Sequence, residues 1–181
     1  MLAVDPLTRL AQRARAGDGP ALGQFVEASY QEVWRLCANL VDNDVAEDLC
    51  QETFARAVRA LAKFRGDSSA RTWLLCIARN TCADELRART LRRRREPTTT
   101  GTSDATLADA SGDITMGDLV SRLGADRRAA FVLTQVIGLS YTEAASVCDC
   151  PVGTVRSRVA RARWDLTGWL RQTGQYERRR A

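Results

Sequence analysis

The sequence predicts an all-α fold with two small helical domains joined by a flexible linker. Apolar residues recur every three or four positions through most of the chain, which is the spacing of one helix face. The pattern stops at residues 97–117, which are rich in Thr, Gly, Ser and Asp and carry acidic but no basic side chains. We therefore place one domain at residues 1–96 and the other at residues 118–181. In a chain of 181 residues, each domain is near the lower size limit for burying its own core.

The composition of the chain excludes several classes of function. Hydrophobic residues make up 45% and charged residues 27% of the chain, as in soluble globular proteins. No apolar run approaches the roughly 18 residues of a membrane span, and the N-terminal segment lacks the apolar centre of a signal peptide. We therefore expect no membrane insertion and a cytoplasmic location. The chain contains no histidine, which excludes His-based acid–base catalysis and His metal ligands.

The six cysteines raise the question of a metal or redox site. Only Cys148 and Cys150 lie close together, as C-x-C, whereas zinc sites favour repeated CxxC-like pairs. In a chain without export signals, cysteine mostly acts as a small core hydrophobe. We therefore expect no metal and no cofactor, and a redox role for this pair stays an open alternative.

Two helices of the first domain frame an acidic patch. Residues 21–41 and 45–64 have the apolar spacing of helices and are separated by the sequence DND. The polar side of the second helix carries a compact set of acids and one amide: Glu47, Asp48, Gln51 and Glu52. Acids near a helix start complement the helix dipole, which is one explanation. A docking site for a basic partner is the other.

A third helix is predicted from residue 70, because Asp67, Ser68 or Ser69 can accept the free amides of its first turn. One stripe of this helix, at 100° per residue, contains Cys76, Asn80, Ala83 and Arg87. The small Ala83 would let a backbone or a base edge approach, and Asn is a versatile base reader. The alternative is that Asn80 only decorates an exposed face.

An arginine run ends this helix, with Arg87, Arg89 and Arg92 to Arg95. So dense a run of like charge repels itself unless an anion neutralises it, so the run predicts a phosphate partner. A solvated basic tail is the alternative.

The second domain is predicted to be a helix-turn-helix. A first helix runs to a stop at Gly138, and Ser140 then opens a short helix as a capping box with Glu143. After a turn at residues 148–150, a long last helix begins near Pro151.

The last helix separates an apolar stripe from a basic one. The apolar stripe steps by three and four residues through Val152, Val155, Val159, Ala162 and Leu166. The far side carries Ser157, Ala160 and Arg161, with Arg156 beside it. A guanidinium there can bond two acceptors on guanine while flanking arginines grip phosphates. A plain amphipathic helix would explain this helix alone, but not the capped pair with its tight turn.

Two segments carry a family resemblance: AEDLCQETFARAVRALAKFRGDSSARTWLLCIARN and IGLSYTEAASVCDCPVGTVRSRVARAR. They resemble the extracytoplasmic-function (ECF) class of bacterial RNA polymerase sigma factors, in the sigma-70 family. The resemblance covers about residues 20–95 and 118–168. It implies a sigma-2 helical bundle and a sigma-4 helix-turn-helix in a transcription initiation factor that is not an enzyme. Such a factor binds core RNA polymerase and directs it to promoters through the −10 and −35 elements.

The resemblance also implies partners and residue roles. Docking on the β′ clamp helices of core polymerase is implied for Asp48, Gln51 and Glu52, and the sigma-4 domain is expected on the β flap. Recognition and opening of the −10 element, as a melted strand, is implied for Arg65, Ser68, Ser69, Arg71, Trp73, Asn80 and Arg87. Recognition of duplex at the −35 element is implied for Thr154, Arg156, Ser157, Arg158 and Arg161. An anti-sigma factor is a further candidate partner.

Two positions depart from the family pattern. Ala160 is small where many relatives carry a large residue, so the −35 sequence that is read stays open. Trp164 also lies on the outward side without being a family signature, and one expectation is that it packs against the C-terminal tail.

Two other classes of protein are weaker alternatives. A dimeric helix-turn-helix repressor would explain the second domain but leaves the patch at residues 48–52 without a role. A nucleic-acid enzyme would need a carboxylate cluster or a nucleophile, and the acids of the first domain lie on one short helical stretch with no partner motif.

Overall fold

The fold is known from a computed structural model, which describes residues 5–95 and 115–180, with side chains only to residue 172 in the second range. The described helices are α1 (Pro6–Arg15), α2 (Gly19–Leu40), α3 (Ala46–Leu61), α4 (Ala70–Arg95), α5 (Met116–Ser121), α6 (Ala125–Phe131), the π-helix η1 (Val132–Val136), α7 (Tyr141–Cys148) and α8 (Val152–Arg180). No strand occurs in these ranges, so the predicted all-α class is confirmed. Most of the predicted linker, residues 97–114, lies outside the described ranges.

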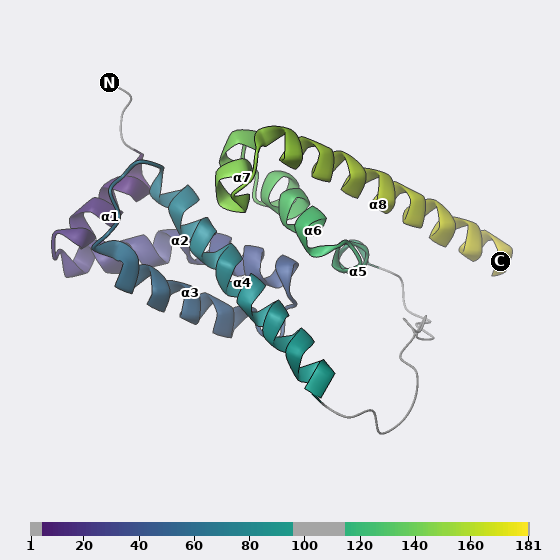
Figure 1. Ribbon diagram of the computed structural model, residues 1–181, viewed down its shortest axis with the longest axis horizontal. Helices are drawn as coiled ribbons and strands as arrows, with labels where there is room; N and C mark the ends of the chain where they lie inside the picture. Colours follow the sequence, from purple (N-terminus) through teal and green to yellow (C-terminus); the bar gives the residue numbers. More distant parts are fainter. Residues whose placement is uncertain (1–4, 96–114, 181) are drawn as a thin grey trace.

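The first domain is a bundle of α1 to α4 (Figure 1). Asp5 caps α1, a helix that the sequence analysis did not assign, by accepting the Thr8 amide at 2.9 Å. The Thr8 hydroxyl in turn accepts the first amide of α4, from Ala70, at 2.8 Å. Of the three predicted caps, Ser69 accepts the Thr72 amide at 3.1 Å. α1 and Ser69 together therefore fix where α4 begins.

Most of the cysteines contribute to the core. Cys37, Cys50 and Cys82 come from α2, α3 and α4 and are at most 1% exposed, and Cys148 is buried in the second domain. Burial raises the pKa of the Cys148 thiol to about 11, so it stays protonated at neutral pH. The prediction that cysteine acts here as a small core residue is confirmed at these four positions.

The second domain corrects one predicted element. The helix expected to run on to the stop at Gly138 is broken into α5, α6 and η1. The chain turns at residues 122–124, which lets Leu119 and Leu123 both reach the core. In η1 the Ile137 amide bonds the carbonyl five residues back, on Val132, at 2.9 Å. Apolar spacing continues through both irregularities, so periodicity alone did not reveal them.

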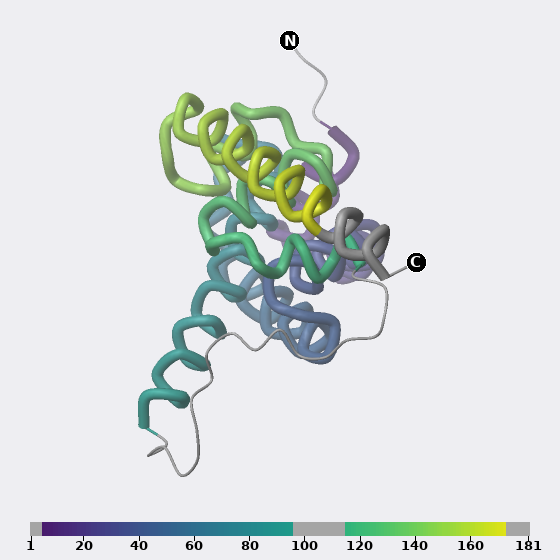
Figure 2. The backbone as a smooth tube through the Cα atoms, turned by 90° about the vertical axis from the view of Figure 1, so that its right-hand side faces the viewer, coloured from purple at the N-terminus to yellow at the C-terminus, as the bar shows by residue number. Residues whose placement is uncertain are grey.

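The two domains pack against each other. α7 lies beside α4, and the buried side chains of both domains form one continuous cluster (Figure 1). Arg128 of α6 donates to the Leu40 carbonyl of α2 at 3.0 Å, and Arg71 of α4 donates to the Ile137 carbonyl at 2.9 Å. In the second view, the last turns of α4 project beyond this joint body (Figure 2). None of the described helices has the length and apolar content needed to cross a membrane.

Candidate functional site

The second domain presents a helix-turn-helix formed by α7 and α8. Ser140 Oγ accepts the Glu143 amide at 3.2 Å and the Glu143 carboxylate accepts the Ser140 amide at 2.9 Å, so the predicted capping box is confirmed. Asp149 then turns the chain in the left-handed conformation, at φ 50°. The Cys150 amide returns to the Ala145 carbonyl at 3.1 Å. These bonds end α7 and set the direction in which α8 leaves it.

The inner stripe of α8 holds the helix on the domain. Val155, Val159, Ala162 and Leu166 are all at most 5% exposed, as predicted, and Val152 is half-buried. Because this side is fixed against the core, the opposite side has a fixed direction into solvent.

The outward side of α8 carries three exposed residues from the predicted −35 set: Arg156, Ser157 and Arg161. The Ser157 hydroxyl donates to the Thr154 carbonyl at 2.9 Å. Neither arginine forms an ion pair with a side chain in the described ranges, whereas Arg127 of α6 pairs with Asp165. The two guanidinium groups are therefore available to acceptors on a ligand.

The other two predicted −35 residues lie differently. Arg158 has a side chain that is only 23% exposed, and it donates to Asp126 at 2.5 Å and to the Cys150 sulfur at 3.5 Å. Thr154 is half-buried. Arg158 thus links α8 to the start of α6 and is turned away from the outward side.

Trp164 shares the outward side and is 79% exposed. α8 continues as one helix to Arg180, so the chain does not fold back over the indole. The expectation that Trp164 packs against the C-terminal tail is wrong.

The predicted docking patch lies on the first turns of α3. Asp48 and Gln51 are exposed there. Glu52 is engaged within the domain, because Arg56 donates to its carboxylate at 2.7 Å and Arg59 lies 3.5 Å away. The bond from Arg56 lowers the pKa of Glu52. Of the two predicted acids, Asp48 therefore has the charge that is least compensated.

The residues assigned to the −10 element occupy the loop before α4 and the first five turns of that helix. In the loop, Arg65 is exposed and pairs with Asp67 at 2.9 Å, and Ser68 is exposed. Ser69 is the helix cap described above. The loop thus brings two cations, Lys63 and Arg65, and the Ser68 hydroxyl to the surface next to the start of α4.

Two members of the −10 set contact other elements of the fold and are only partly exposed. Arg71 is paired with Glu32 at 2.5 Å and also holds the Ile137 carbonyl of the second domain. Trp73 is half-buried, and its ring centroid lies 5.0 Å from that of Phe64 in a tilted arrangement. The contact between Trp73 and Phe64 holds the loop against α4, whereas Arg71 joins α4 to α2 and to the second domain.

The later members of the −10 set lie further along α4. Asn80 is exposed, and its side-chain oxygen accepts a bond from Arg79 at 3.1 Å. Arg87 is exposed and pairs with Asp84 at 2.7 Å. Asn80 keeps its amide nitrogen available to a ligand, so it can still donate to a base edge.

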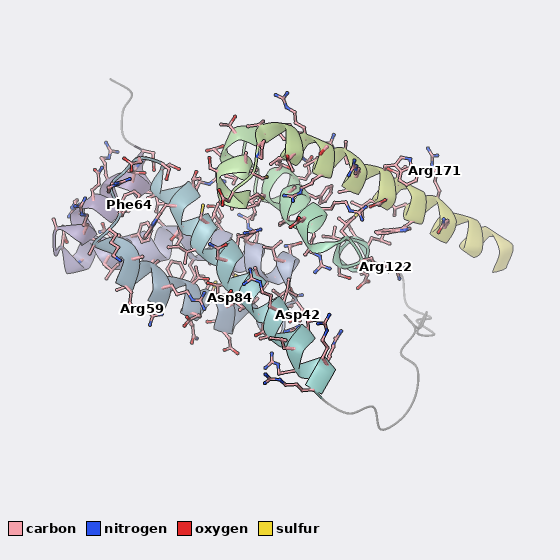
Figure 3. The ribbon with its side chains drawn as sticks, viewed as in Figure 1. Asp42, Arg59, Phe64, Asp84, Arg122 and Arg171 are labelled. Atoms are coloured by element: carbon pink, nitrogen blue, oxygen red, sulfur yellow. The ribbon has the colours of Figure 1, made fainter. Side chains whose placement is uncertain are left out.

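Acids compensate part of the arginine run. Arg89 bonds Asp42 at 2.5 Å and Glu85 at 2.7 Å, and Arg92 bonds Glu85 at 2.9 Å. Asp42 lies next to the later turns of α4 (Figure 3), and its bond from Arg89 lowers its pKa. The prediction that this run needs an outside anion is therefore weakened for Arg89 and Arg92, because carboxylates of the same domain already neutralise their charge.

The stripe predicted to approach a base borders the second domain. The Cys76 thiol lies 3.6 Å from the Ser146 carbonyl of α7. Ala83 and Arg87 line a hollow whose other wall includes Ala125 and Ala129 of α6. The sequence carried no signal for this placement, because nothing in a helical period says which surface a distant domain will cover.

Comparisons with known proteins agree with this architecture. Residues 25–92 match Sigma-70 region 2, and residues 115–166 match Sigma-70, region 4. The chain is 46% identical over 166 residues to the ECF RNA polymerase sigma factor SigC of Mycobacterium tuberculosis, with 88% of each chain covered. It is 36% identical over 176 residues to the ECF RNA polymerase sigma-E factor of Escherichia coli K12, covering 85% of this chain and 88% of the other.

Two solved structures share the fold. One is CnrH in complex with the cytosolic domain of CnrY, at 27% identity and a TM-score of 0.73, covering 93% of this chain and 99% of the other. The second is the sigma factor RpoE with the anti-sigma factor NepR from Bartonella quintana, at 29% identity and a TM-score of 0.69, covering 82% and 96%. Both domain matches and both near-full-length relatives agree, and the chain belongs to the ECF class of the sigma-70 family, the transcription initiation factors that direct core RNA polymerase to promoters.

Proposed function

We propose that this sigma factor contacts its promoters and core polymerase through three separate surfaces. The outward side of α8 binds duplex at the −35 element. The loop at residues 62–69 and the exposed side chains of α4 bind the melted −10 strand. The patch on the first turns of α3 docks on the β′ clamp helices, while the second domain sits on the β flap.

One observation carries the −35 assignment: Arg156 and Arg161 are exposed on a helix whose opposite side is buried, and no described acid neutralises them. The second helix of a helix-turn-helix enters the major groove with its first turns. A guanidinium there can bond O6 and N7 of guanine together, a pairing worth about 1–3 kcal/mol of discrimination. The side chains of Ala160 and Ser157 are small enough to let the helix lie deep in the groove.

The −10 assignment is supported by where the exposed polar groups lie. Arg65 and Ser68 reach solvent from the loop, and Asn80 does so from α4. Taking a base out of the stack costs a few kcal/mol, which a rigid pocket and phosphate contacts can offset. In this proposal, Ser69 and Trp73 keep the loop in place by the cap and the ring contact that they make, and Arg71 anchors the start of α4 to α2 by its ion pair with Glu32.

The protein acts by binding rather than by catalysis, and it acts in the cytoplasm, where polymerase and promoters are. Two structural relatives were solved with partner chains, one the cytosolic domain of CnrY and the other named as the anti-sigma factor NepR. We include an anti-sigma factor among the partners of this chain on that ground.

The test begins with promoters selected from a random library by core polymerase reconstituted with the full-length chain. On the best selected promoter, we expect Arg161→Ala to weaken binding by about tenfold, and much less on promoters with a scrambled −35 element. The matched control is Arg122→Ala, which removes the same charge from the exposed end of α5 (Figure 3). An equal loss for Arg161→Ala on every promoter, with Arg122→Ala unchanged, would mean that α8 binds DNA without reading its sequence.

A second arm tests the −10 assignment with the same promoters. We expect Asn80→Ala to lower run-off transcription and to change the tolerance to −10 substitutions, with binding to core polymerase unchanged. Equal transcription from a panel of −10 variants by both proteins would make Asn80 a surface residue without a reading role.

A further inference from the structure

Trp164 is the most exposed of the large apolar side chains in the described ranges, at 79%. An indole in water is costly, because it leaves a large apolar surface solvated. Leu170, on the same helix, is exposed at 45% and lies on the flank of α8. The high exposure of the indole therefore needs an explanation, whereas the partial exposure of Leu170 follows from its position on the flank of the helix.

The indole lies in the middle of the outward side. At 100° per residue, it is directly opposite the buried stripe, in line with Ser157 and Ala160. It is seven residues beyond Ser157, which is about 10 Å further along the helix axis. The major groove is about 12 Å wide, so a helix that places Ser157 on the groove floor brings Trp164 to the groove wall.

Small residues flank the indole on both sides along this line. Ala160 lies one turn before it and Gly168 one turn after it. A Cβ built on Gly168 would meet nothing within 4 Å. Trp164, Gly168 and Arg171 line a shallow hollow on the surface of α8. A ligand can therefore reach the face of the indole and the backbone beside it.

The charge around the hollow is positive. Arg161 lies one turn before Trp164 and Arg171 two turns after it, and neither forms an ion pair with a described side chain. Asp165, the acid next to the indole in sequence, is held by Arg127 of α6. Arg171 projects on the side of α8 that faces away from α5 and α6 (Figure 3). The partner of this surface is thus an anion with apolar parts.

We propose that Trp164, with Arg171, forms a second DNA contact beyond the base-reading part of α8: the indole packs on a deoxyribose of the groove wall and Arg171 binds an adjacent phosphate. The sugar supplies the apolar surface, and the indole Nε1–H can donate to a phosphate oxygen. This contact positions α8 on the duplex and carries no sequence information. The inference rests on the proposed binding of α8 at the −35 element.

A protein partner is the competing occupant, because exposed tryptophan is also common at protein interfaces. DNA is favoured for two reasons. The surface continues the outward stripe of α8 without interruption, and its free charges are all guanidinium groups, which match a phosphate backbone.

The test uses holoenzyme reconstituted from core polymerase and the full-length chain, at one fixed salt concentration. We compare Trp164→Ala and Trp164→Phe with Leu170→Ala, which removes an exposed apolar side chain from the flank of the same helix. Each is measured on promoter fragments with an intact and with a scrambled −35 element. Arg161→Ala is measured in parallel, to report on the base-reading part of α8. Ethylation interference then maps the phosphates needed by each variant.

We expect Trp164→Ala to weaken binding about fivefold to tenfold on both kinds of fragment, a loss of about 1 kcal/mol or slightly more. Trp164→Phe should keep part of the affinity, and Leu170→Ala should stay within about twofold of wild type. The interference pattern of Trp164→Ala should lose its dependence on one or two phosphates next to the −35 element. Binding to core polymerase should not change.

Three results would overturn the inference. Unchanged DNA binding by Trp164→Ala while Arg161→Ala loses specificity would remove the Trp164 contact and leave the −35 assignment in place. A loss confined to the intact −35 element would make the indole a base reader, and a loss of core binding would assign the surface to a protein partner. If Arg161→Ala also behaves as wild type, the proposed binding of α8 fails with it.

Discussion

Arginine has two different roles in this chain, and the role depends on whether an acid is within reach. All but one of the 27 basic residues are arginine, so residue type alone does not separate them. Arg56, Arg71 and Arg158 are held by carboxylates from other parts of the fold. Arg156 and Arg161 have no such partner among the described side chains. The first group stabilises the fold, and the second is available to DNA.

Arg158 and Arg156 provide a direct comparison of the two roles. Arg158→Ala breaks the pair with Asp126, so we expect it to lower the free energy of unfolding by about 0.5–1 kcal/mol. Arg156→Ala, two residues earlier, should leave stability unchanged and weaken binding to promoter DNA. Denaturant titration and promoter binding, measured on both variants, check this. If Arg158→Ala loses −35 specificity at unchanged stability, the residue belongs to the reading surface after all.

Asp48 is the residue at which to test core docking. Asp48→Lys should weaken binding to core polymerase about tenfold, because it places like charges together at an interface. Its thermal unfolding should match wild type, since Asp48 is exposed. Glu52→Lys should weaken core binding too, but it also removes the acceptor of Arg56 and so changes the domain itself.

The control for this experiment is Glu27→Lys, which reverses an exposed acid on α2 outside the patch. Competition for core polymerase against wild type measures all three variants. Equal competition by Asp48→Lys and wild type would contradict the docking assignment.

At the scale of elements, local sequence signals located the capped starts of α4 and α7, whereas the capped start of α1 was missed. The Ser140 and Glu143 pair is a local device: both partners lie within four residues, so the pattern is visible in the sequence. The break between α5 and α6 has no such signal, because the chain turns there to bury Leu119 and Leu123 against other helices.

The capping box predicts an acid-sensitive step in the second domain. The bonds from Ser140, with a smaller contribution from Arg71, hold the pKa of Glu143 below its ordinary value of 4.5. A carboxyl with a lowered folded pKa adds stability that is complete above the unfolded pKa and is lost as pH falls through the folded pKa. We therefore expect the stability from this carboxylate to be present at pH 7 and to be lost as the pH falls below the ordinary value of 4.5 and through the lowered pKa.

Glu143→Gln isolates this effect, because glutamine also forms a capping box but does not titrate. The melting temperature of wild type should fall more than that of Glu143→Gln between about pH 5 and pH 3. Parallel melting curves over this range, with the same slope for both proteins, would exclude Glu143 as the titrating group.

At the scale of the molecule, the packing of the two domains conflicts with simultaneous binding of both promoter elements. The −35 and −10 elements are about 25 base pairs apart, or roughly 85 Å at 3.4 Å per pair. A compact chain of 181 residues has a radius of gyration of only about 16 Å. The stripe on α4 also borders α6 and α7. We therefore expect the domains to separate when the holoenzyme binds a promoter.

Arg71 is the residue at which to test this contact. It joins Glu32 to the Ile137 carbonyl across the domain boundary, so Arg71→Ala should loosen the boundary and raise the radius of gyration of the free chain. Arg65→Ala is the control, because among the described side chains Arg65 pairs only with Asp67 of its own loop. Small-angle X-ray scattering on both variants measures the difference. Identical scattering from wild type and Arg71→Ala would show that Arg71 does not hold the domains together.

The sequence by itself determined the helical class, the capping box, the buried stripe of α8 and the family. Each of these depends on residues within a few turns of one another, where the helical period and the capping geometry apply. Only the tertiary structure decided that Arg158 is paired, that the helix before Gly138 is broken, and that α4 lies against α7. Those outcomes depend on which acid or apolar surface a segment far away in the sequence brings near. A helical period contains no information about contacts between such distant segments.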